Sequence, residues 1–94
     1  MEETDAEKLE YIKKNSTLAE ELYRCDRFKG LDYEEICKIL EERGKSTIGL
    51  KIKIDRGIML GIINYYIDRR FPSDKKFFMT NEGKKIYDRI PSVG

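Results

Sequence analysis

Basic side chains in the second half of the chain have the clearest capacity for chemistry, because Lys and Arg bind anions. Residues 43–94 carry twelve Lys and Arg against five Asp and Glu, whereas residues 1–42 carry seven against thirteen. The overall charge of +1 therefore conceals an acidic half and a basic half. This asymmetry suggests an anionic partner for the second half. The alternative is that the two halves simply pair with each other.

Catalytic and metal chemistry are poorly represented. The chain has no histidine, which removes His-dependent nucleophilic catalysis and HExxH zinc sites. Gly44-Lys45-Ser46 matches only the end of a phosphate-binding loop, because Ile39 stands where the first glycine would be. We therefore expect no enzymatic activity, no bound metal and no cofactor.

Cys25 and Cys37 have two open interpretations. Two cysteines cannot supply four zinc ligands within one chain, and their spacing is not that of a CxxC redox motif. They are either small apolar residues of the core or a Cys25–Cys37 disulfide, which requires an oxidising or hyperthermophilic cell. The composition favours the hyperthermophilic setting, because Gln and Trp are absent, Asn is scarce, and Ile, Lys and Glu are abundant.

The expected location is cytoplasmic. No apolar run approaches the roughly 18 residues that cross a membrane. The acidic start, Met1 to Asp5, is the opposite of a secretory signal. Ninety-four residues suffice for one domain with a modest core.

The first predicted helix runs from about Asp5 to Cys25, with a weak spot at residues 15–17 where it can break in two. Tyr11, Leu18 and Leu22 fall on one face at helical spacing. Such a long helix offers more apolar surface than a core of this size needs. We therefore expect residues 1–16 to form a helical extension that makes a homodimer contact, and residues 17–94 to form the domain.

The second predicted helix starts at a capping box, with Asp32 at the N-cap and Glu35 three residues later. It runs to about Arg43, and Gly44 ends it. Its expected buried positions follow the helical period: Tyr33, Ile36, Cys37 and Leu40.

A third helix is predicted from Ser46 or Thr47, either of which can cap it, to about Leu60. Residues 50–55 also alternate apolar and polar, as a strand would. We favour the helix because a stripe of apolar and glycine residues follows the helical period: Leu50, Ile54, Gly57, Ile58 and Gly61.

A β-hairpin and a short helix complete the expected order. The strands are residues 62–69 and 76–79, joined by a charged turn that contains Pro72. Thr80 caps the final helix, which Pro91 ends, and Ile86 and Ile90 should pack inward.

This order and two motifs resemble the winged helix-turn-helix family, particularly members from archaea and their viruses. Phe78-Met79-Thr80-Asn81-Glu82-Gly83-Lys84 is similar to the junction between the last strand and the last helix of winged helices. Leu60-Gly61-Ile62-Ile63 is similar to the exit from the recognition helix. The resemblance covers residues 17–90 and implies an α+β fold of three helices, a β-hairpin wing and a short C-terminal helix. It also implies binding of double-stranded DNA.

Candidate DNA-binding residues lie on the recognition helix and on the wing. Lys and Arg neutralise phosphates, and a helix fits the major groove, where Arg56 is the best candidate for a guanine contact. A basic hairpin beside this helix suits the backbone or the minor groove, although charges also protect exposed strand edges. The full set is Lys45, Ser46, Thr47, Gly49, Lys51, Lys53, Arg56, Arg69, Arg70, Lys75 and Lys76.

Two functions follow from these residues. The first is a dimeric transcriptional regulator that binds a pseudo-palindromic site in double-stranded DNA. The alternative is a winged-helix adaptor that binds a protein and not DNA, for which the near-neutral total charge is mild support.

Overall fold

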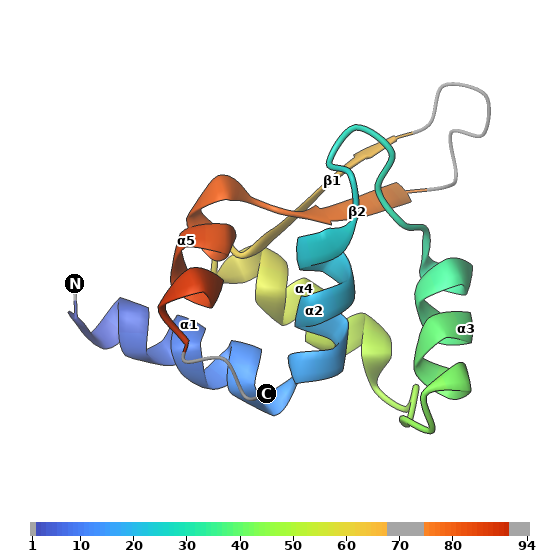
Figure 1. The fold of residues 1–94 in the computed structure, drawn as a ribbon, viewed down its shortest axis with the longest axis horizontal. Helices are drawn as coiled ribbons and strands as arrows, with labels where there is room; N and C mark the ends of the chain where they lie inside the picture. Colours follow the sequence, from blue (N-terminus) through green and yellow to red (C-terminus); the bar gives the residue numbers. More distant parts are fainter. Residues whose placement is uncertain (1, 68–74, 91–94) are drawn as a thin grey trace.

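The structure is a computed structural model that describes residues 2–67 and 75–90. Its elements are arranged as an α+β fold, with α3 toward one end of the longest dimension and the start of α1 at the other (Figure 1). Within the described part of the chain, no helix is both long and apolar enough to cross a membrane. In chain order the elements are α1 (Glu2–Lys14), α2 (Ser16–Arg24), α3 (Tyr33–Glu42), α4 (Leu50–Met59), β1 (Ile63–Ile67), β2 (Lys75–Met79) and α5 (Asn81–Arg89).

The first predicted helix is two helices, and the break lies at the expected weak spot. Asn15 leaves the helical conformation, and its side-chain amide donates a hydrogen bond to the carbonyl of Tyr11 at 3.0 Å. The break turns α1 back against α5 (Figure 1). Tyr11 and Ile12 are consequently buried in the same core as Leu18 and Leu22. The apolar surface of this helix that was expected to make a dimer contact is therefore largely buried within the chain.

Helix α3 begins with the predicted capping box. The Asp32 carboxylate accepts from the Glu35 N–H at 2.7 Å, and the Glu35 carboxylate accepts from the Asp32 N–H at 3.0 Å. Ile36 and Leu40 are buried as expected, and Cys37 is half-buried. The prediction for Tyr33 is wrong, since 42% of it is exposed. Tyr33 is the first residue of the helix, and it lies at the rim of a hollow instead of in the core.

Residues 50–59 form a helix, and the strand interpretation is wrong. The helix begins later than predicted, because Gly49 at the N-cap has a left-handed φ of +72°. Ser46 does not cap it; its hydroxyl accepts from the N–H of Ile48 at 3.1 Å. The predicted inward stripe is confirmed at three positions, which are Leu50, Ile54 and Gly57.

Gly57 is needed where α4 meets α1 and β1. A Cβ at this position would lie 2.5 Å from Ile63 Cδ1 and 2.7 Å from the hydroxyl of Tyr11. The same Tyr11 hydroxyl donates a hydrogen bond to the carbonyl of Lys53 at 2.5 Å. A glycine inside α4 therefore lets the first helix and the first strand approach it closely.

Strands β1 and β2 pair antiparallel, with Ile63 opposite Met79 and Ile67 opposite Lys75. Leu31 adds a further bridge that the sequence did not reveal, because it exchanges two backbone hydrogen bonds with Phe77 at 2.8 and 2.9 Å. Phe77, Ile63 and Met79 are buried. The hairpin is thereby anchored both to the core and to the connection that precedes α3.

The two stretches that resembled winged-helix motifs are in direct contact. The Thr80 hydroxyl accepts from the Gly83 N–H at 2.9 Å and donates to the Gly61 carbonyl at 2.6 Å. The Thr80 N–H donates to the Ile62 carbonyl at 2.8 Å. A Cβ on Gly83 would lie 2.7 Å from that same carbonyl oxygen. We call the group Gly61, Ile62, Thr80 and Gly83 the junction, because it joins the end of α4 to the start of α5.

Candidate nucleic-acid interface

Helix α4 presents a long solvent-facing side. Its buried positions, Leu50, Ile54 and Gly57, define one face, and residues about 100° apart along the helix fall on the others. Ile52 and Met59, seven residues apart, lie on the opposite face with 74% and 78% exposure. The exposed polar residues of the helix flank this face, and they are Lys51, Lys53, Asp55 and Arg56.

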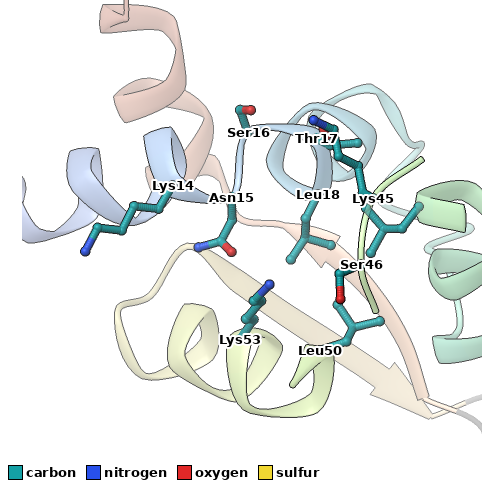
Figure 2. Close-up of a pocket in the computed structure, with 10 residues that line it drawn as sticks. Lys14, Asn15, Ser16, Thr17, Leu18, Lys45, Ser46, Leu50 and Lys53 are labelled. Atoms are coloured by element: carbon teal, nitrogen blue, oxygen red, sulfur yellow. The ribbon is translucent and has the colours of Figure 1, made fainter. Parts of the chain in front are cut away.

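A hollow lies between the start of α4 and the boundary between α1 and α2 (Figure 2). Lys53 extends from α4 into it, and Lys45 reaches from the connection after α3 toward Thr17 (Figure 2). Ser46 lines the same hollow, as does Lys14. None of the ten described lining residues is acidic. The hollow therefore combines lysine ammonium groups with hydroxyl and amide groups, which suits an anion.

Arg56 lies on the side of α4 that faces α1. Its guanidinium is 3.6 Å from the carboxylate of Glu7, and half of its side chain is exposed. Glu7 and Glu10 line a second hollow with Lys53 and Arg56. Such a surface ion pair is weak, so Arg56 can exchange Glu7 for another anion at little cost.

Lys51 and Lys75 border a third hollow, between α4 and the hairpin. Lys75 is exposed at the start of β2, with its ammonium 4.7 Å from the centre of the Tyr65 ring. The structure thus places Lys75 of the hairpin and Lys51 of α4, both predicted to bind DNA, at the same hollow. Arg69 and Arg70, the other expected wing residues, lie outside the described residues.

Lys76 is held by the protein itself. Its ammonium lies 3.4 Å from the carboxylate of Asp32 and 3.6 Å from that of Glu35, and its side chain is only 21% exposed. Partial burial lowers the pKa of Lys76, but the hydrogen bonds and attraction from both carboxylates outweigh it and raise that pKa overall. Lys76 consequently ties β2 to the start of α3, and it is the least available of the described candidate residues.

Comparison with known proteins identifies the fold. No protein-family model matches the chain, and no curated protein matches it. The chain is similar to the crystal structure of a MepR mutant from a multidrug-resistant S. aureus clinical isolate. The TM-score is 0.63 at 15% sequence identity, over 93% of this chain and 67% of that one. The fold is a winged helix. Helix α4 is the helix that the sequence predicted as the recognition helix, and β1 and β2 are the strands of the predicted wing.

The acidic and basic halves of this winged helix do pair in part. Arg43 bonds Glu20 and Glu21 on α2, and Arg89 on α5 bonds Asp5 on α1. Among the described residues, by contrast, no carboxylate lies within 4.0 Å of the ammonium groups of three lysines, which are Lys45, Lys51 and Lys53. Three of the lysines that remain after internal pairing therefore lie on α4 or in the connection that leads into it.

The two cysteines are free thiols, each half-buried. The Cys25 thiol points toward the Phe77 carbonyl, with sulfur and oxygen 4.0 Å apart. Burial is the main cause that raises the pKa of Cys25, which keeps the thiol protonated and weakly nucleophilic at neutral pH. Cys25 thus packs against β2 of the hairpin.

Sequence reasoning missed the exposed apolar side chains on α4 and in the turn before it. Ile48, in the turn before α4, is 85% exposed, and Ile52 and Met59 are nearly as open. Their position opposite the stripe of Leu50 and Ile54 was a usable signal. It was hidden because an isoleucine in an alternating segment is normally assigned to the core.

Proposed function

We propose that this protein is a double-stranded DNA-binding transcriptional regulator that places α4 in the major groove. The supporting observation is the lysine excess around a single exposed helix, since Lys51 and Lys53 flank its outward face and Lys45 borders the hollow at its start. A helix of this width fits the major groove, and phosphates on either side of the groove then meet these lysines. Lys75 on the wing extends the same basic surface toward the backbone or the minor groove.

The candidate residues divide between positioning and reading. Ser46 and Thr47, just before the recognition helix, supply hydroxyls for a phosphate. Gly49 is exposed, and apart from its chain neighbours no described atom lies within 4 Å of the position that its Cβ would take. The backbone can approach DNA closely there. Arg56 is the candidate for a guanine contact, which requires it to leave Glu7.

We expect the protein to act as a homodimer, which matches a pseudo-palindromic site with half-sites about one helical turn apart. Helix α1 is the expected contact. Because Tyr11 and Ile12 are buried within the chain, such a contact has to use the remaining face of α1, including half-buried Leu9. Sedimentation equilibrium of the wild type and of Leu9→Glu tests this. A dimer that the substitution dissociates supports it, and a monomeric wild type overturns it.

Fluorescence anisotropy with a labelled random-sequence duplex tests DNA binding itself. Affinity should fall steeply between about 50 and about 200 mM salt, because each phosphate contact releases counterions. A Lys51→Gln, Lys53→Gln double variant should flatten the slope of log affinity against log salt by about 2. Lys84→Gln with Lys85→Gln on α5 removes the same charge from another helix and should leave the slope nearly unchanged. Binding that does not depend on salt would count decisively against the proposal.

The adaptor alternative has one observation in its favour, the exposed apolar side chains of Ile48, Ile52 and Met59. Reversing the charges of Lys53 and Arg56 distinguishes the two functions. Under the DNA proposal, duplex binding is lost. If duplex binding is unchanged while a protein partner is lost, the chain is an adaptor.

A further inference from the structure

The exposed apolar side chains on α4 and in the turn before it are candidates for contact with a binding partner. A side chain that is three-quarters exposed contributes little to folding, and scattered apolar residues on a surface are ordinary. These residues are not scattered, however. Ile52 and Met59 share the outward face of one helix, and Ile48 precedes that helix in the turn that leads into it. Lys51 lies on one flank of this face and Lys53 on the other.

We propose that Ile48 and Ile52 read thymine methyl groups in the major groove, an inference that rests on the proposed DNA binding. The C5-methyl of thymine is the apolar group that a base edge offers in the major groove, and apolar side chains recognise it by contact. Lysines on both flanks specify a polyanion as the body that covers this face. Duplex DNA supplies both features at once, with phosphates at the groove edges and methyl groups on its floor.

Position along the helix assigns this role to Ile48 and Ile52 and not to Met59. Residues near the N-terminus of a recognition helix contact base edges. Ile48 and Ile52 lie at that end, with the open backbone of Gly49 between them. Met59 is seven residues beyond Ile52, or about 10 Å further along the axis, at the last residue of α4. Met59 is therefore a matched control: exposed, apolar and on the same face.

The remaining acidic group on this helix is compatible with base reading. Asp55 is exposed on the side of Lys51. A carboxylate repels phosphate, but it accepts a hydrogen bond from the exocyclic amine of cytosine. The outward face of α4 thus carries groups that fit base edges, whereas its flanks carry groups that fit phosphates.

The test replaces thymine with deoxyuridine, which lacks only the methyl group. A duplex is first selected from a random library with the full chain, and each thymine in it is then replaced singly. Each methyl that Ile48 or Ile52 contacts should cost about fourfold in affinity when removed. Ile52→Ala, at an exposed position, should bind the thymine and deoxyuridine duplexes equally at the position it reads, which completes a double-mutant cycle.

Two control variants separate this inference from the proposed function. Lys53→Gln should weaken binding to the thymine and deoxyuridine duplexes by the same factor. Met59→Ala should keep the preference for thymine. Salt-dependent binding that is indifferent to the methyl at every position, or a thymine preference that Ile52→Ala retains, overturns methyl reading while DNA binding stands. A chain that binds no duplex overturns both, and the apolar face then belongs to a protein contact.

Discussion

The junction and the outward face of α4 are adjacent in the chain but are governed by opposite constraints. At the junction, Thr80 satisfies three backbone groups, and Gly83 leaves no room for a side chain beside Ile62. On the outward face and its flanks, Ile52 and Lys53 are exposed, and their side chains contribute little to the stability of the fold. Substitutions at the junction should therefore change stability, and substitutions on the face should change binding alone.

The largest expected effect on stability is at Gly83. In Gly83→Val, the new side chain meets the Ile62 carbonyl and Met79, and the free energy of unfolding should fall by about 3 kcal/mol. Lys85→Val, an exposed position on the same helix, should cost less than about 1 kcal/mol. Urea denaturation measures both. Equal losses in the two variants would contradict the importance of the close approach.

Thr80→Val should have the next largest effect. It keeps the shape of the side chain but leaves the Gly83 N–H and the Gly61 carbonyl without their partner. A loss of about 1–2 kcal/mol in unfolding free energy is expected. Thr80→Ser retains the hydroxyl and should recover most of that loss. A Ser variant as unstable as the Val variant would assign the effect to the missing methyl and not to the hydrogen bonds.

Tyr11→Phe probes the contact between α1 and α4. It removes the hydrogen bond to the Lys53 carbonyl, which should cost about 1 kcal/mol at neutral pH. Burial raises the pKa of Tyr11 in the folded protein, so the unfolded chain loses its proton first. The wild type should hold its full stability below pH about 10 and lose it as pH rises above that value. Thermal denaturation between pH 8 and 11 should show that the stability of the Phe variant declines less with rising pH than that of the wild type. An identical decline would mean that the titration of another group causes the loss.

The smallest effect on stability is expected on the flanks of the outward face. Lys51→Gln with Lys53→Gln should change the free energy of unfolding by less than about 0.5 kcal/mol, because both side chains are exposed. The same urea titrations measure this. A loss comparable to that of Thr80→Val would mean that these lysines serve the fold.

Local residue chemistry made much of the fold predictable. The capping box at Asp32, the break near Asn15 and the Thr80 cap each involve neighbours in the chain, so residue types and spacing suffice to find them. Gly83 also belongs to the motif that resembles the winged-helix strand-to-helix junction, yet the reason for a glycine there, the close approach of the Ile62 carbonyl, is visible only in three dimensions.

Contacts between distant residues set the limit of sequence reasoning. Lys76 was expected to face DNA, but Asp32 and Glu35 lie 44 and 41 positions away in the sequence and hold it in place. Tyr33 has the helical period of a core residue, yet it is 42% exposed and lies at the rim of a hollow, because no residue among 2–67 and 75–90 covers it fully. The site was therefore predictable as a basic helix, while the availability of each residue on it was not.

Salt-dependent anisotropy of wild type and the Lys51→Gln, Lys53→Gln variant on one labelled duplex tests the central claim most directly. The account predicts a steep fall of wild-type affinity with salt. In the variant, the slope of log affinity against log salt should be shallower by about 2, and the free energy of unfolding should be unchanged. The same slope for both proteins, or no measurable binding by the wild type at low salt, would contradict the assignment of α4 as a DNA-binding helix.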